Sequence, residues 1–243
     1  MGSNSIFLTT EEAIDAITID FRQYRPQIML FCSIIRLISG SEIHFQREPG
    51  KEGVWINQRA RTNMRWIEGA ELVDYMCAAI RRTPWTIELL ATVCRCVFQG
   101  RATPATAPDT GCEGLEIDTQ MNDFKCRQCG RCCRSLDYGH EVRDEDVKLW
   151  RSLGRDDILR WVETTFQKDK IVAYRIWIVP GSQERARTCP FLKKEPAANR
   201  WTCAIHEVKP LICRNYPVSR KHAVMTGCRG FENPKCGNSL PRG

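Results

Sequence analysis

The stretch KCRQCGRCC, residues 125–133, places four cysteines within eight positions. In Cys126-x-x-Cys129 the two intervening residues form a turn that directs both sulfurs toward one point, an arrangement typical of two thiolates on one metal ion. Gly130 permits the left-handed backbone conformation that such turns need. Cys129-x-x-Cys132 repeats the spacing. The stretch therefore indicates a metal site built from thiolates.

Cys133 follows Cys132 directly and complicates this interpretation. Adjacent side chains diverge in regular backbone conformations, so we expect the two sulfurs not to lie on the same face of a turn. They would then reach different corners of a polynuclear cluster, or serve two sites. A metal-free structural or redox-active dithiol is the alternative. We favour metal, because burying four thiolates together without a cation is costly.

More cysteines follow in the same half of the chain, in settings that suggest further ligands. They are found in Cys189-Pro-Phe-Leu, Cys203-x-x-His206, Pro210-x-x-Cys213-Arg-Asn-Tyr-Pro217 and at Cys228. The pattern is neither a zinc ribbon, which needs a second C-x-x-C, nor a bacterial ferredoxin run, which has no adjacent cysteines. Eight thiols suit two four-ligand sites, or one cluster with additional structural cysteines. Small buried apolar side chains are the alternative for the later cysteines.

Three of these motifs, CRQCGRCC, CPFL and CAIHEVKPLICRNYP, occur in the order found in the YkgJ-type cysteine-cluster family, which the chain resembles over about residues 120–236. That family is described as zinc- or iron-chelating and includes relatives of the flagellin lysine N-methylase. The resemblance implies metal binding through eight ligands. They are Cys126, Cys129, Cys132, Cys133, Cys189, Cys203, Cys213 and Cys228.

Three polar residues accompany these cysteines. His206 could complete a Cys-x-x-His pair, but a packed or hydrogen-bonded histidine is the stronger expectation. Arg214 and Tyr216 could line a substrate or anion pocket. We expect them to donate hydrogen bonds to thiolate sulfurs instead.

An iron–sulfur cluster, of the 4Fe–4S type, is the first cofactor expectation and zinc the second. Thiolates suit both metals, and the number of thiols and the adjacent pair favour the cluster. Two enzyme activities are compatible with this cofactor. One is an iron–sulfur-dependent oxidoreductase. The other, implied by the resemblance to methylase relatives, is a protein lysine N-methyltransferase that uses S-adenosylmethionine. The chain has no G-x-G-x-x-G loop, so S-adenosylmethionine would have to bind the cluster directly.

The elements that must position the cysteines follow from residue patterns. Residues 144–154 and 156–166 predict two short helices, the first with acidic residues in its first turn. Residues 170–180, KIVAYRIWIVP, are β-branched and aromatic and predict a strand. Residues 189–205 predict two short strands around a turn at 195–199.

The first half of the chain predicts helices. In residues 9–39 apolar side chains recur at steps of three and four after a capping-box sequence, and Pro26 should kink or split this helix. Residues 66–82 and 85–99 predict two more helices, the last with Thr83 as its N-cap. A short strand is expected at GVWIN. The remaining cysteines are expected to be core or incidental residues: Cys32, Cys77, Cys94, Cys96 and Cys112.

The sequence therefore predicts a helix-rich α+β chain in two parts. A helical domain of unknown role covers residues 1–100, and a Pro-, Thr-, Ala- and Gly-rich linker covers 101–118. A loop-rich, metal-stabilised cysteine-cluster domain covers 119–243.

The net charge of +7 is unevenly distributed, because residues 121–243 carry 24 Lys and Arg against 14 Asp and Glu. This excess can offset the negative charge of metal-bound thiolates, and the basic residues form no long run, so nucleic acid is not the expected partner. A protein partner is the alternative to nucleic acid. The start of the chain lacks the basic and apolar regions of a signal peptide, and the longest apolar run is too short to span a bilayer. We expect a cytoplasmic protein with reduced cysteines and no membrane insertion.

Overall fold

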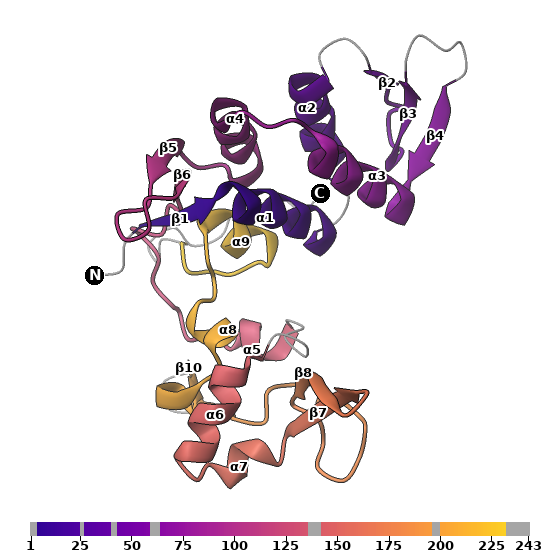
Figure 1. Ribbon diagram of the computed structural model, residues 1–243. Helices are drawn as coiled ribbons and strands as arrows, with labels where there is room; N and C mark the ends of the chain where they lie inside the picture. The colour runs from indigo at the N-terminus through magenta and orange to yellow at the C-terminus, as the bar shows by residue number, and fades with distance from the viewer. Residues whose placement is uncertain are drawn as a thin grey trace. The chain divides into compact units, whose positions relative to one another are not determined.

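The computed structural model describes residues 4–24, 27–39, 43–58, 64–135, 142–195 and 200–231. It divides into two compact units, Met1–Asn122 and Asp123–Gly243. Both contain helices and antiparallel strands, which confirms the predicted α+β class (Figure 1).

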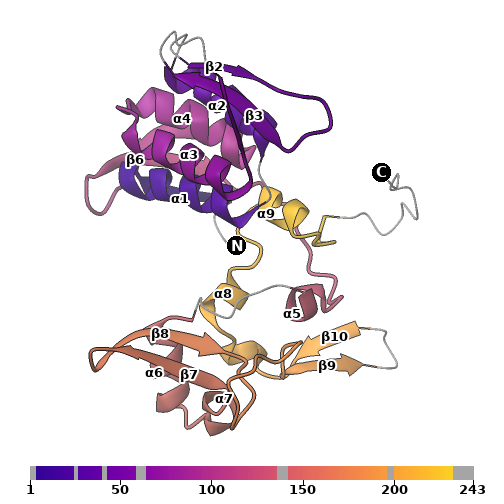
Figure 2. The same cartoon turned by 90° about the vertical axis from the view of Figure 1, so that its right-hand side faces the viewer.

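The helices of the first unit account for most of its core. α1 (Thr10–Gln23) begins with the predicted capping box between Thr9 and Glu12, and α2 (Ile28–Ser39) follows as a separate helix. The predicted break is therefore present, although Pro26 itself lies outside the described residues. α1 packs against α3 (Gly69–Arg82) and α4 (Ile87–Phe98), as Figure 2 shows.

Strands were largely missed in this unit. β2 (Ile43–Gln46), β3 (Gly53–Gln58) and β4 (Arg65–Glu68) form one antiparallel sheet, of which only β3 was predicted. The helix predicted from residue 66 begins at Gly69 because β4 precedes it, and α4 takes Thr86 rather than Thr83 as its N-cap.

The segment 101–118, predicted as a linker, also forms strands. β5 (Ala102–Thr106) and β6 (Glu113–Asp118) join β1 (Ser5–Thr9) in the order β1-β6-β5. Threonine favours extended backbone, and Pro104 is tolerated because β5 is an edge strand. The composition of this segment, rich in Pro and Gly, therefore did not predict its strands.

The core of the first unit contains three of the cysteines expected there, since Cys32, Cys77 and Cys94 are buried among the apolar side chains of α1–α4. Cys112 is exposed. None of the described helices is long and apolar enough to cross a bilayer.

The second unit has a smaller core of its own. α6 (Asp144–Ser152) matches the prediction, and the hairpin of β7 (Val162–Gln167) and β8 (Lys170–Ile176) packs on α6 and on α7 (Asp156–Leu159), as Figure 2 shows. The helix predicted for 156–166 is therefore wrong after its first turn. Its second half, Val-Glu-Thr-Thr-Phe, is β-branched and pairs with β8.

The predicted cysteines of this unit sit on short elements or loops. α5 (Arg131–Ser135) carries an adjacent pair, β9 (Leu192–Glu195) and β10 (Arg200–Cys203) form the expected hairpin, and α8 (Leu211–Arg214) carries another cysteine. A 3₁₀ turn (His206–Val208) precedes α8, and α9 (Arg220–Met225) precedes Cys228.

Candidate metal centre

One cavity of the second unit brings together all the cysteines that the sequence analysis singled out as ligands. Its volume is about 990 Å³. Every one of the eight predicted ligands lines it, although they come from separate segments of the chain. They are Cys126, Cys129, Cys132, Cys133, Cys189, Cys203, Cys213 and Cys228.

The turn through Cys126-x-x-Cys129 has the expected left-handed backbone. Gln128 and Gly130 have φ angles of 49° and 66°. The carbonyl of Gln128 accepts a hydrogen bond from the backbone N–H of Trp201 at 2.8 Å, which ties the turn to β10. A Cβ on Gly130 would lie 2.7 Å from Cγ of Trp201, so only glycine fits between the turn and the indole ring.

Arg134 connects α5 to this turn. Its guanidinium donates to the carbonyls of Cys129 and Gly130, at 3.0 and 3.3 Å, and lies 5.0 Å from the ring centre of Trp201. The side chain thus holds α5, with its two cysteines, against the backbone that carries the first two.

The side chains of Cys132 and Cys133 were expected to diverge, and the structure corrects this expectation. Sγ of Cys132 and Sγ of Cys133 lie 3.9 Å apart, so the two side chains converge although their Cα atoms are neighbours. The side-chain rotamers, which the sequence does not reveal, decide the direction of the sulfurs.

Long-range backbone contacts connect the first cysteines to the end of the unit. The N–H of Lys125 donates to the carbonyl of Gly230 at 3.0 Å, and the rings of Phe124 and Phe231 pack 5.5 Å apart. Cys126 and Cys228 are therefore brought to the same side of the cavity.

A second set of contacts connects the later cysteines. The N–H of Cys189 donates to the carbonyl of Cys133 at 2.8 Å. Cys203 pairs with Leu192 in the β9–β10 hairpin, and both Cys189 and Cys203 pack against the apolar core of the unit. The hairpin and the core thus hold these sulfurs beside α5.

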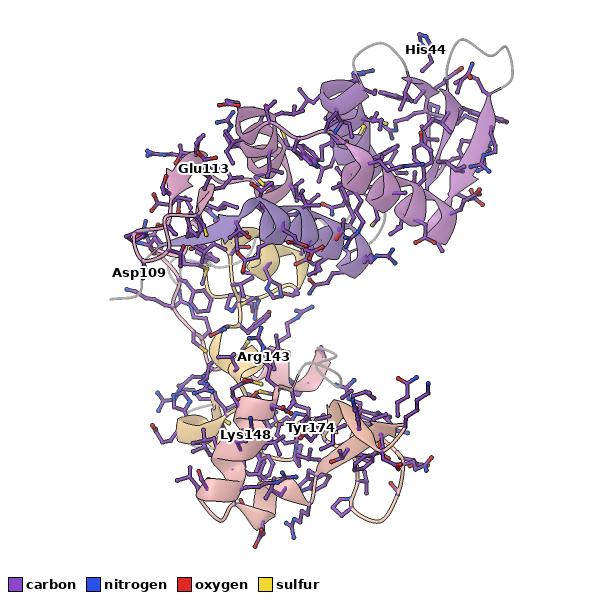
Figure 3. All side chains as sticks on the ribbon, viewed as in Figure 1. His44, Asp109, Glu113, Arg143, Lys148 and Tyr174 are labelled. Carbon is purple, nitrogen blue, oxygen red and sulfur yellow. The ribbon has the colours of Figure 1, made fainter. Side chains whose placement is uncertain are left out.

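Cys213 is positioned by an acidic residue that the sequence analysis took only for part of a helix start. Asp146 on α6 is 1% exposed. One of its oxygens, Oδ1, accepts from the N–H of Leu211 at 2.9 Å and from Arg214 at 3.3 Å, which fixes both ends of α8. Oδ2 accepts from the N–H of Arg143, which Figure 3 labels at the start of α6. No motif spacing connects residues 65 positions apart, so this contact left no signal in the sequence.

The three polar residues named with the cysteines all line the cavity. Arg214 pairs with Asp146, and His206 lies exposed at the start of the 3₁₀ turn. The phenol of Tyr216 is 2.7 Å from Oγ1 of Thr226. Burial, together with the neighbouring Cys228 and Cys132, raises the pKa of Tyr216 to about 12.

The electrostatics of the cavity oppose ionisation of four of these thiols, Cys132, Cys133, Cys213 and Cys228. Burial and the neighbouring thiols raise the pKa of Cys213 to about 12. The hydrogen bond with Cys132 lowers the pKa of Cys133, but the interactions with Cys189 and burial outweigh it and raise that pKa to about 12. Hydrogen bonding to Cys133 and burial raise the pKa of Cys132, whereas the hydrogen bond from Cys133 lowers that of Cys189. Burial raises the pKa of Cys228.

The donor set fits a soft metal centre. In the part of the chain that the structure describes, no group of three or more His, Cys, Asp or Glu side chains is close enough as it stands to hold a metal ion. The chemistry of the lining is nevertheless specific, because eight thiols line one cavity, and burial together with neighbouring thiols raises the pKa of Cys213 and of Cys228. A cation at their centre would reverse that effect, and thiolates select zinc and iron.

Comparison with known proteins agrees with this chemistry. Residues 125–233 match the family model described as "CxxCxxCC: Putative zinc- or iron-chelating domain". Searches of curated proteins and of solved structures found no match. The matched region begins at Lys125, one residue before Cys126, and contains all eight cysteines predicted as ligands. Residues 125–233, in the second unit of this chain, therefore match the CxxCxxCC cysteine-cluster family, whose domain is described as zinc- or iron-chelating.

Proposed function

We propose that the second unit is a metal cofactor domain, in which the eight cavity cysteines are the ligands and the metal is iron in an iron–sulfur cluster. The observation that carries this proposal is the gathering of all eight around one cavity. When bound, such a cluster supplies one-electron transfer or a site for binding a substrate group. The protein would be an oxidoreductase or a group-transfer enzyme in the reducing cytoplasm.

The backbone contacts support a division of the eight ligands into two groups. Lys125–Gly230 connects the first segment to the last, and Cys133–Cys189 connects α5 to the β9–β10 hairpin. We assign Cys126, Cys129, Cys132 and Cys228 to one group. The other group contains Cys133, Cys189, Cys203 and Cys213.

Each group has four thiols, the number that a structural zinc ion or a 4Fe–4S cluster requires. The neighbours Cys132 and Cys133 connect the groups, with their sulfurs 3.9 Å apart. Two adjacent centres are therefore the arrangement that we propose.

Metal and sulfide analysis tests the proposal. The protein is purified without oxygen, and iron, zinc and acid-labile sulfide are measured per chain. We expect a brown protein with about eight iron and eight sulfide per chain, because each of the two proposed clusters holds about four of each. A colourless protein with zinc would support a different function, that of a zinc-stapled module that binds nucleic acid or protein. A protein free of both metals would overturn the proposal.

Single variants test the division into groups. Cys228→Ala and Cys189→Ala should each remove about half of the metal, because each breaks one centre of two. Loss of all metal in both variants would mean one shared centre. Cys112→Ala is the control, since Cys112 is exposed in the first unit.

A protein lysine N-methyltransferase that uses S-adenosylmethionine is the second enzyme class that we propose. In this case the cavity would have to hold the cofactor next to the cluster. A change in the EPR spectrum of the reduced protein on addition of S-adenosylmethionine would support it, and an unchanged spectrum would favour the oxidoreductase.

A further inference from the structure

One of the eight proposed ligands differs from the others in its surroundings. Cys126 is exposed to solvent, whereas the other seven are half-buried. The residues on either side of it, Lys125 and Arg127, are exposed as well. In the described part of the second unit, Cys126 is not among the side chains that pack on the apolar core, whereas Cys189 and Cys203 are. Water therefore reaches the sulfur of Cys126 more easily than that of any other proposed ligand.

The other three members of its group are fixed by the fold. The carbonyl of Cys129 accepts from Arg134 at 3.0 Å, and Cys132 lies on α5. The N–H of Cys228 donates to a carbonyl of α9 at 2.7 Å. By contrast, the hydrogen bonds of the described residues include none from or to Cys126. Three ligands are thus held in place, and the fourth lies on an exposed segment outside any helix or strand.

This difference affects how strongly each sulfur can hold a metal ion. A ligand on an exposed segment must lose backbone and side-chain freedom each time it binds, whereas a ligand fixed by the fold has already lost it. The bond to Cys126 is therefore the weakest of the four. Metal sites of enzymes have the same pattern, because three protein ligands stay and the fourth position is open to water or substrate.

The cavity also has room for an external molecule. Its volume of about 990 Å³ lies at the upper end of the range of small-molecule sites, which is about 300–1,000 Å³. A molecule that enters the cavity could therefore approach a metal ion held there.

We infer that Cys126 is the exchangeable ligand of its group, and that an external nitrogen or sulfur donor takes the position that it leaves. Cys126 releases the metal and takes a proton from solvent, and a lone pair of the donor forms the new bond; no electron is transferred. Zinc and iron both accept such donors. The inference deepens the proposed function and rests on it, because it places the substrate within the same site.

The metal content of two variants tests the inference first. Cys126→Ala, purified without oxygen, should keep nearly all the metal of the unmodified chain, because three fixed ligands stay. Cys129→Ala is the matched comparison and should lose about half of it, as expected for a fixed ligand of one centre of two. Equal losses in both variants would overturn the inference.

Alkylation of the unmodified, metal-loaded chain does not depend on the folding of a variant. Iodoacetamide should modify Cys126 at least about tenfold faster than Cys129, since a sulfur that leaves the metal reacts while a bound one is protected. Peptide mass spectrometry gives the two rates, and metal analysis of the same samples should show no loss. Cys112, exposed in the first unit, reports the rate of a thiol outside the site. Equal rates at Cys126 and Cys129, or loss of metal as Cys126 reacts, would overturn the inference.

Imidazole is the probe for the external donor. The EPR spectrum of the reduced protein reports its binding if the metal is iron, and the visible spectrum of cobalt-substituted protein does so if the metal is zinc. Cys126→Ala should bind imidazole at least about tenfold more tightly than the unmodified protein, because no thiolate competes for the position. Cys112→Ala should bind it as the unmodified protein does. A spectrum of Cys126→Ala that imidazole does not change would overturn the inference.

The same samples separate the inference from the proposed function. A loaded chain whose Cys126→Ala variant loses metal as Cys129→Ala does would overturn the inference and leave the metal domain intact. An unmodified chain that binds neither iron nor zinc would overturn both.

Discussion

The carboxylate of Asp146 accepts the backbone N–H of Leu211 at 2.9 Å, although the two residues lie on different helices. The same oxygen pairs with Arg214. Asp146 is buried and both contacts flank Cys213, so one side chain of α6 sets the position of a proposed ligand. These contacts attach α8 to α6, which packs in the apolar core of the second unit.

Replacing this carboxylate by its amide should weaken the second unit. Asp146→Asn leaves one oxygen where three donors converge and removes the charge that Arg214 needs, so we expect a loss of about 2–3 kcal/mol in the free energy of unfolding. Urea unfolding of the metal-loaded protein measures it. Asp157→Asn is the matched control, because its exposed pair with Arg155 should contribute at most about 1 kcal/mol. Equal losses in both would contradict the role of Asp146.

Gly130 should tolerate no side chain. Gly130→Ala combines a φ of 66° with a contact of 2.7 Å to Trp201. Gly154→Ala meets a similar φ of 61° but open space, so it carries only the backbone cost of about 1 kcal/mol. We expect the first variant to lose more stability and to bind zinc more weakly. The difference between the two thermal unfolding curves isolates the contact with the indole, and identical curves would show that Trp201 moves freely.

Metal loading should release protons. The pKa values of Cys133 and Cys213 are about 12, so these thiols are protonated at neutral pH and must lose their protons to bind a cation. The apparent affinity for zinc should therefore rise between about pH 6 and 8. Calorimetry in buffers of different ionisation enthalpy counts the protons released. A heat that does not depend on the buffer would mean that the thiolates exist before metal arrives.

The metal-free protein should lose stability in alkali. The folded pKa of Cys213 is about 12, above the value of about 8.5 for an unfolded cysteine, so this contribution is complete below pH 8.5 and is lost as the pH rises toward 12. The slope is about 1.4 kcal/mol per pH unit for each such thiol. Cys213→Ala should show a shallower decline in urea unfolding between pH 8.5 and 10. An unchanged slope would mean that other groups cause it.

Removal of metal should loosen one unit and spare the other. The two units have separate apolar cores, and the proposed ligands all belong to the second. A structural metal site contributes on the order of 10 kcal/mol to folding. In Cys129→Ala, amide hydrogen exchange should therefore accelerate across residues 123–231 and stay slow in α1–α4. Faster exchange in both units would show that the first depends on the metal as well.

Local sequence patterns predict several of the helices and strands. The capping box of α1, the acidic first turn of α6 and the β9–β10 hairpin were all predictable, because caps, apolar spacing and turn residues act over a few positions. The strands β5 and β6 were not, since their pairing with β1 comes from tertiary contacts that override a linker-like composition.

The sequence by itself determined which side chains could bind metal: cysteines in a C-x-x-C-x-x-C-C run and in three later motifs have a chemistry that does not depend on the fold. Only the tertiary structure decided which of them lie together. The hydrogen bonds of Lys125 with Gly230 and of Cys133 with Cys189 join segments separated by many residues, and Asp146 positions Cys213 from another helix. Spacing along a chain specifies local geometry, whereas the convergence of distant segments depends on long-range packing. That is why the candidate ligands could be predicted from the sequence, while their proposed grouping needed the structure.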